Sequence, residues 1–135
     1  MTTVVILVLA LVGLALLLPR ASPGWALLAD RPHGLTDWSA LYEQAQASVV
    51  AAALEEIRLS FFLRPDDLQR LKPEDSLLAI YRAAYPELGG VDSQEFESLY
   101  ATLRSRFNVP ADELQALSDP TVGDVLGLAV RYSGA

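Results

Sequence analysis

Residues 92–132 read DSQEFESLYATLRSRFNVPADELQALSDPTVGDVLGLAVRY. Two capping boxes start helices in this stretch, Asp92 with Glu95 and Thr121 with Asp124. Behind the first box, apolar residues recur at three- and four-residue steps, which is the pattern of one face of an amphipathic helix. These residues are Phe96, Leu99, Tyr100, Leu103 and Phe107. The pattern predicts a helix that buries this face.

Pro110 ends that helix, because proline lacks the N–H that a helix interior needs. A short helix over 111–117 follows, with Leu114 and Leu117 turned inward. The last helix begins at the second capping box and buries a further apolar face. Its members are Val122, Val125, Leu126, Ala129 and Val130. Nothing in residues 36–135 alternates with period two for the length of a strand, so we expect an all-α domain.

The chain upstream of this stretch is also helical in pattern. Apolar residues at three- and four-residue steps predict one long helix from Thr36 to about Leu63, rich in alanine in its middle. Pro65 opens a short helical turn, and a further short helix runs from about Leu77 until Pro86. We therefore expect a four-helix bundle of roughly 100 residues, large enough for one modest core, with an extra short helix before its second helix.

The first eighteen residues contain no charged side chain, and residues 4–18 read VVILVLALVGLALLL. As a helix, residues 1–18 would extend roughly 27 Å, close to the ~30 Å hydrocarbon core of a bilayer. The alternative is a cleaved signal peptide, which needs a positive n-region and a small-residue cleavage site. Residues 1–3 carry no positive side chain, and prolines at 19 and 23 make a poor site. We expect an uncleaved transmembrane anchor.

Three segments follow from these patterns: a single-pass transmembrane anchor at 1–18, a Pro/Gly-rich linker at 19–35 and the helical domain at 36–135. Arg20 and Arg31 lie on the C-terminal flank of the anchor, and no basic side chain lies on its N-terminal flank. The positive-inside rule then places the helical domain in the cytoplasm.

Composition excludes several classes of function. The 135 residues include no cysteine, which rules out disulfides, thiolate nucleophiles and cysteine-based metal sites. His33 is the only histidine, and its place beside Pro32 and Gly34 is typical of an exposed loop residue without a role. A net charge of −7 argues against attraction to nucleic acid. No general base, metal set or phosphate loop accompanies the acidic residues near turns, and we expect a protein that is not an enzyme.

The stretch 91–132 resembles the acyl carrier proteins, small helical bundles that carry acyl groups on a phosphopantetheine arm. Four landmarks fall at the offsets of that family without a gap: Asp92-Ser93, Phe107, Val109-Pro110 and Thr121-Val122-Gly123-Asp124. In the family these positions are the modified Asp-Ser, the phenylalanine that closes helix II, the break after it and the start of helix IV. The resemblance implies an acyl-carrier-like bundle.

The resemblance also implies that Ser93 is the attachment site of 4′-phosphopantetheine, next to Asp92. Physical chemistry suits this role, because a phosphodiester at the first turn of a helix meets unpaired N–H groups and the positive end of the helix dipole. Gln94, Glu95 and Glu97 are then the expected partner-binding residues. The alternative is that the Asp92–Glu95 box only caps a helix.

A second Asp-Ser-Leu, at Asp75-Ser76-Leu77, does not fit the same offsets, because the fifteenth residue after Asp75 is Gly90. The chain also departs from the family. Gln94 replaces the leucine that usually follows the modified serine, and arginines offset the acidic residues of a helix that is usually strongly acidic in carriers. These departures bear on modification and partner choice more than on the fold.

Together these features predict a membrane-anchored acyl-carrier-like protein. It would present a phosphopantetheine-bound acyl group to membrane-associated acyl-transferring enzymes in lipid or envelope synthesis, after a phosphopantetheinyl transferase has modified it. The alternative is an anchored adaptor of the same fold that has no prosthetic group and acts by protein–protein interaction.

Overall fold

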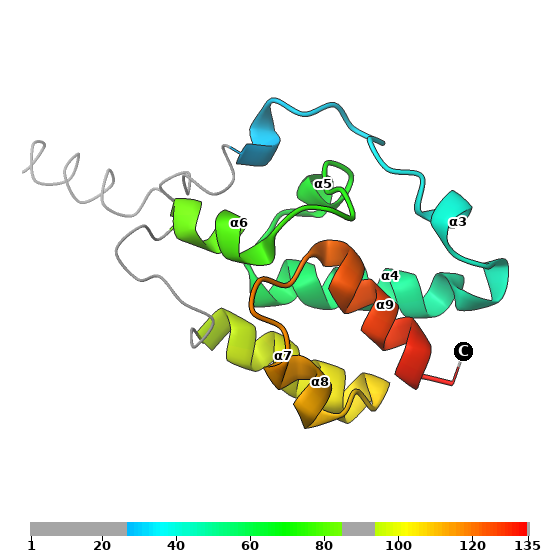
Figure 1. Cartoon of the computed structure of the whole chain (residues 1–135). Coiled ribbons are helices and arrows are strands. Elements are labelled where there is room, and N and C mark those ends of the chain that lie inside the picture. The colour runs from blue at the N-terminus through cyan, green and yellow to red at the C-terminus, as the bar shows by residue number, and fades with distance from the viewer. Residues whose placement is uncertain (1–26, 85–93, 135) are drawn as a thin grey trace, which may run out of the picture.

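The computed structural model describes residues 27–84 and 94–134, and the described part of the chain is helical without a strand (Figure 1). An isolated antiparallel bridge joins Ser76 and Thr121. The expectation of an all-α domain is confirmed. In chain order the elements are α3 (Trp38–Leu41), the 3-10 helix η1 (Gln44–Gln46), α4 (Ala47–Ser60), α5 (Pro65–Leu68), α6 (Leu77–Ala84), α7 (Gln94–Phe107), α8 (Ala111–Gln115) and α9 (Val122–Tyr132).

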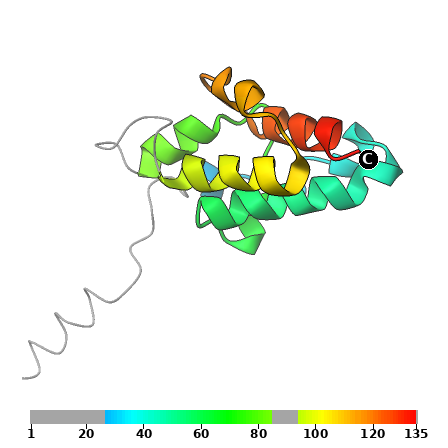
Figure 2. The ribbon, with the colours of Figure 1, turned by 90° about the horizontal axis from the view of Figure 1, so that it is seen from below.

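Three long helices form the centre of the bundle: α4, α7 and α9 each contact the other two. Figure 2 shows α7 running alongside α4, and the colours of the ribbon show that the two helices run in opposite directions. The predicted inward face of α7 is confirmed, with Tyr100 half-buried and the other members buried. On α9 the buried residues are Val122, Val125, Leu126 and Ala129. The second capping box is also confirmed, since Thr121 and Asp124 exchange both backbone N–H bonds.

The first long helix differs from the sequence expectation. The chain does not run as one helix from Thr36, because the backbone is extended at Tyr42 (φ −130°, ψ 152°) and Glu43 (φ −65°, ψ 150°). The Glu43 N–H donates to the Gln46 side chain at 3.2 Å, and the Gln46 N–H donates to the Glu43 carbonyl at 2.9 Å. These bonds begin the next helical segment. In residues 38–46, which we call the α3–η1 segment, α3 is therefore separated from α4 by the break, while η1 leads directly into α4.

The two halves of the bundle repeat one pattern. Each has a long helix, a residue in the left-handed region, a short helix and a capped helix; the left-handed residues are Phe62 (φ 55°) and Asn108 (φ 58°). The N–H of Leu77 donates to the Pro120 carbonyl, and the N–H of Val122 donates to the Asp75 carbonyl, at 3.0 and 2.9 Å. This pair of bonds ties the start of α6 to the start of α9.

The described part of the predicted linker packs on the domain. Leu28 is fully buried in the core. Arg31 pairs with Asp75 at 2.6 Å, and the Thr36 hydroxyl donates to the Leu71 carbonyl at 2.8 Å. His33 is exposed, as expected. These contacts hold residues 27–36 against α5 and the loop that follows it.

The predicted anchor at 1–18 lies outside the described residues. Within residues 27–84 and 94–134, no helix has the length and apolar character needed to cross a membrane.

Two glycines of α9 predict opposite effects of the same substitution. At Gly123 a Cβ would lie 3.0 Å from the Pro73 carbonyl oxygen, and that oxygen is held in place by a 2.8 Å bond from the Gly123 N–H. At Gly127 no heavy atom lies within 4 Å of an added Cβ. We expect Gly123→Ala to destabilise the fold by about 1–3 kcal/mol and Gly127→Ala to stabilise it by about 0.5–1 kcal/mol. Denaturant midpoints of the two variants measure this, and shifts in the same direction would contradict it.

Candidate functional site

The predicted attachment site precedes α7. Asp92 and Ser93 lie outside the described residues, and the structure describes the chain again from Gln94, the first residue of α7. Of the three predicted partner-binding residues, Gln94 and Glu97 are exposed and Glu95 is half-buried. The structure therefore places these three side chains on the first turn of one helix, where a partner can reach them.

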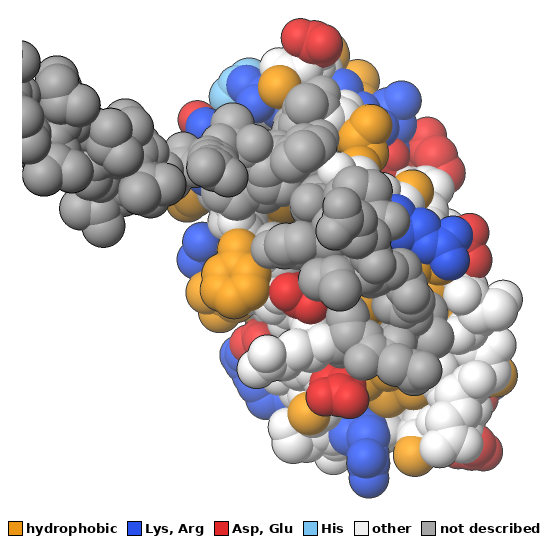
Figure 3. All heavy atoms as spheres, turned by 90° about the vertical axis from the view of Figure 1, so that its left-hand side faces the viewer, with side chains coloured by type: hydrophobic (Ala, Val, Ile, Leu, Met, Phe, Trp, Pro, Cys, Tyr) orange, Lys and Arg blue, Asp and Glu red, His pale blue; other side chains and the backbone are white. Residues whose placement is uncertain are grey.

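The N-terminal end of α7 is fixed by an aromatic cluster. The ring of Phe96 lies 5.1 Å from that of Phe61 and 6.0 Å from that of Tyr81, between ring centroids. These contacts join the first turn of α7 to the end of α4 and to α6. Figure 3 looks at this end of the molecule, where acidic, basic and hydrophobic side chains mix on the described surface. The first turn of α7, which begins at Gln94, is therefore packed against the end of α4 and against α6.

The charges of α7 are divided between its two ends. Glu95 and Glu97 lie in its first turn, and Arg104 and Arg106 lie in its last. This arrangement complements the helix dipole. Arg106 forms an ion pair with Glu56 of α4. The arginines that balance the acidic residues in the sequence thus lie at the far end of the helix, and the end next to Ser93 is acidic.

Ser76, the serine of the second Asp-Ser-Leu, has a structural task. Its hydroxyl donates to Asp119 Oδ1 at 2.5 Å and accepts the Ala79 N–H at 3.0 Å. It also belongs to the bridge with Thr121. The Ser76 hydroxyl thus caps α6 and contacts the loop before α9, so its observed role is structural.

A cavity of about 340 Å³ lies between α7 and α8. Leu114 and Leu117 give it an apolar wall, while Tyr100 and Arg104 line it from α7. The Tyr100 hydroxyl is buried and forms no hydrogen bond within the described residues, and burial raises the pKa of this phenol. A buried hydroxyl without a partner is costly.

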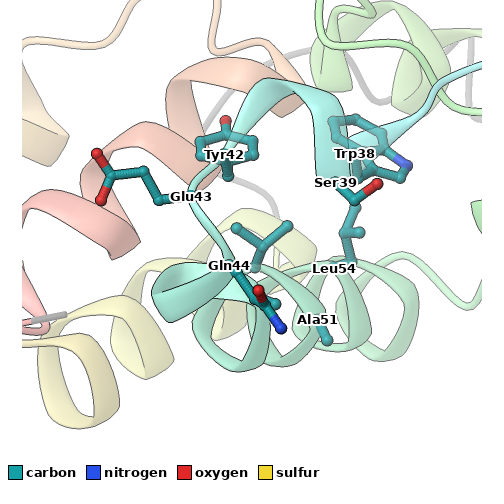
Figure 4. Close-up of a pocket in the computed structure, with 9 residues that line it drawn as sticks. Trp38, Ser39, Tyr42, Glu43, Gln44, Ala51 and Leu54 are labelled. Atoms are coloured by element: carbon teal, nitrogen blue, oxygen red, sulfur yellow. The ribbon is translucent and has the colours of Figure 1, made fainter.

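A second cavity, of about 480 Å³, lies between the α3–η1 segment and α4. Figure 4 shows Trp38 and Tyr42 on the α3–η1 side, with Ala51 and Leu54 on the helix beneath them. Burial raises the pKa of the Tyr42 phenol. The sequence pattern predicts one continuous helix from Thr36 to about Leu63, which would include Trp38 and Tyr42. The signal for the break was the Glu43–Gln46 spacing, which precedes an alanine-rich run.

In residues 27–84 and 94–134, no group of three His, Asp or Glu side chains is placed to hold a metal ion. Comparison of the chain with protein-family models, with curated proteins and with solved structures found no match.

Proposed function

We propose that this protein is a membrane-anchored acyl-carrier-like protein that presents a phosphopantetheine-bound acyl group to membrane-associated enzymes. The observation that carries the proposal is the order of the helices that follow Ser93 in the chain. In the sequence Ser93 directly precedes α7, which covers Gln94–Phe107, ends at the buried Phe107, and is followed by the short α8 and the capped α9. The protein itself catalyses nothing in this proposal, because the thiol of the arm does the chemistry.

The cavity between α7 and α8 supports the proposal by its position. Tyr100 lies six residues after Gln94, which is roughly 9 Å along the helix. A group carried on an arm at Ser93 would therefore find an apolar wall, made by Leu114 and Leu117, one to two turns from its attachment point. We propose that this cavity shelters the apolar part of the carried group.

The acidic first turn of α7 indicates the kind of partner. Glu95 and Glu97 lie beside the attachment position, and their charge favours a partner surface rich in lysine and arginine. Gln94 is exposed at the same turn and offers a hydrogen-bonding amide. We propose that the transferase and the acyl-transferring enzymes approach the bundle at this end.

The anchor limits where such partners act. In this proposal residues 1–18 span the bilayer, and Leu28 is fixed in the core of the domain. The ten residues from 18 to 28 extend at most about 35 Å. The domain would thus stay within that distance of the cytoplasmic membrane surface, which favours enzymes that work on membrane-bound substrates.

One observation favours the second candidate, an anchored adaptor without a prosthetic group. The exposed residue after Ser93 is Gln94, where carriers have a leucine. In this reading the same acidic turn binds a partner protein, and Ser93 stays unmodified.

Modification of the full-length protein separates the two candidates. We expect incubation with coenzyme A and a broad-specificity phosphopantetheinyl transferase to raise the intact mass by one phosphopantetheine group. Ser93→Ala should abolish the increment, while Ser98→Ala, which changes an exposed serine of α7, should leave it unchanged. Gln94→Leu should speed the reaction if this amide weakens recognition by the transferase.

Two outcomes of this experiment would contradict the proposal. If folded protein gains no mass with several transferases, including one encoded alongside it, the carrier function is wrong and the adaptor takes its place. Retention of the increment in Ser93→Ala would move the attachment site elsewhere in the chain.

A further inference from the structure

The cavity between the α3–η1 segment and α4 exists because two features of the chain coincide. Because of the break at Tyr42 and Glu43, α3 does not continue the axis of α4. On the facing side of α4, the lining residues Ala47 and Ala51 are too small to fill the space that this creates. Its volume of about 480 Å³ lies within the range of about 300–1,000 Å³ that is usual for small-molecule sites.

The side chains that line this cavity are mostly apolar, and two of them are aromatic. Trp38 and Tyr42, both half-buried, face Val50 and Leu54, which are buried residues of α4. In the view of Figure 4, Tyr42 lies between Trp38 at one end and Glu43 at the other. An apolar molecule can therefore contact an indole, a phenol ring and aliphatic side chains at once.

The charge of the lining is one-sided. Glu43 lies at one end of the lining, and in Figure 4 its carboxylate points away from Tyr42 and Trp38. Ser39 and Gln44 contribute neutral polar groups, and no lysine or arginine is among the described residues that line the cavity. Asp37, which precedes the lining residue Trp38 in the chain, accepts a hydrogen bond from the hydroxyl of Ser39. Carboxylates and aromatic faces both attract cations, and the face of tryptophan attracts them best. An anion would find no cationic side chain among the described lining residues.

This cavity lies away from the end of the bundle that the proposed function uses. It faces the first half of α4, whereas Phe61, at the other end of that helix, contacts Phe96 in the first turn of α7. A helix of the 14 residues in α4 is roughly 21 Å long. Occupancy of the cavity therefore does not require an arm at Ser93.

From these observations we propose that the cavity between the α3–η1 segment and α4 binds a small apolar molecule that carries an ammonium group. The alkyl or aryl part packs between Trp38 and Leu54, and the ammonium group lies at the Tyr42–Glu43 end. The site is independent of the proposed carrier function, and either can fail without the other.

The test compares three probes that share a six-carbon chain: hexyltrimethylammonium, hexanol and hexanoate. Each is titrated into the ¹⁵N-labelled full-length protein, with Trp25→Phe used to assign the indole N–H signal of Trp38. We expect saturable shifts at that indole and at the Ala51 amide. Hexyltrimethylammonium should bind about five-fold more tightly than hexanol, as an exposed cation–π contact predicts, and hexanoate should bind most weakly.

Matched variants locate the site and its charge preference. Ala51→Leu should fill the cavity and weaken all three probes about ten-fold or more, while Ser48→Leu, an exposed change on the same helix that does not face the cavity, should leave binding unchanged. Glu43→Gln keeps the size of the side chain but removes the charge, and it should weaken the ammonium probe alone.

Three results would overturn the proposal. The first is equal or tighter binding of hexanoate, and the second is a loss of binding in Ser48→Leu as large as in Ala51→Leu. The third is movement of the Trp38 and Ala51 signals on raising the protein concentration without a probe, which would make a second copy of the chain the occupant.

Discussion

Phe96→Ala is expected to lower the free energy of unfolding by about 3–5 kcal/mol. Phe96 is fully buried, and its ring makes edge-to-face contacts with Phe61, Tyr81 and Tyr100 at centroid distances of 5.1, 6.0 and 6.0 Å. Such pairs add roughly 0.5–1.5 kcal/mol each beyond the burial of area. Because the ring joins α4, α6 and α7, the cavity left by its removal cannot close by the movement of one side chain. Chemical denaturation of the full-length protein measures the loss.

Phe62→Ala is the matched control for this prediction. Phe62 is 68% exposed, so its truncation removes little buried area, and we expect a change of under about 1 kcal/mol. A loss of under about 1 kcal/mol for Phe96→Ala, or equal losses for the two variants, would contradict the central place of Phe96. In that case the first turn of α7 would not be fixed by the aromatic cluster. The proposed function, which relies on the position of this turn directly after Ser93, would then lose its structural support.

The helices α7 and α9 were predictable from the sequence because their signals are local. The inward face of α7 repeats at helical spacing, and the box of Thr121 and Asp124 lies within four residues. The exposure of Gln94 and Glu97 follows from the same register. Local patterns of this kind need no knowledge of the rest of the fold.

The break before α4 was missed for a physical reason. Glutamate is not among the preferred N-cap residues, and the alanine-rich sequence that follows Glu43 favours a helix on propensity alone. The half-burial of Trp38 and Tyr42 suits both a continuous helix and a separate segment. The cavity beneath them depends on how residues 38–46 fold back on α4, which no periodicity in the chain encodes.

The pairing of α6 with α9 was out of reach for a different reason. The bonds between Leu77 and Pro120 and between Val122 and Asp75 join residues more than forty positions apart. The role of Ser76 follows from this pairing, since its hydroxyl contacts Asp119 across the same gap in sequence. In the sequence, the mismatch of offsets argues against Ser76 as an attachment site, and the capping contacts of Ser76 add a structural reason.

The burial of Leu28 leads to the second large effect. The sequence assigns residues 19–35 to a linker, yet the side chain of Leu28 is fully buried in the core of the bundle. We expect Leu28→Ala to lower the free energy of unfolding by about 2–5 kcal/mol, as other large-to-small changes in cores do. The Leu35 N–H, which donates to the Gln69 carbonyl at 3.3 Å, should then exchange its proton faster. Denaturation and amide hydrogen exchange of the full-length protein measure the two effects.

The neighbouring Leu27 supplies the control, because it has the same side chain and is 47% exposed. Leu27→Ala should change stability by under about 1 kcal/mol and leave the exchange of the Leu35 N–H as it was. Equal and small effects of the two substitutions would place Leu28 in a solvated linker after all. A large effect of Leu28→Ala alone would show that the folded domain begins before residue 28. If residues 1–18 span a bilayer, as we propose, at most about ten residues would join them to the domain, and a partner at the acidic turn of α7 would have to work close to that bilayer.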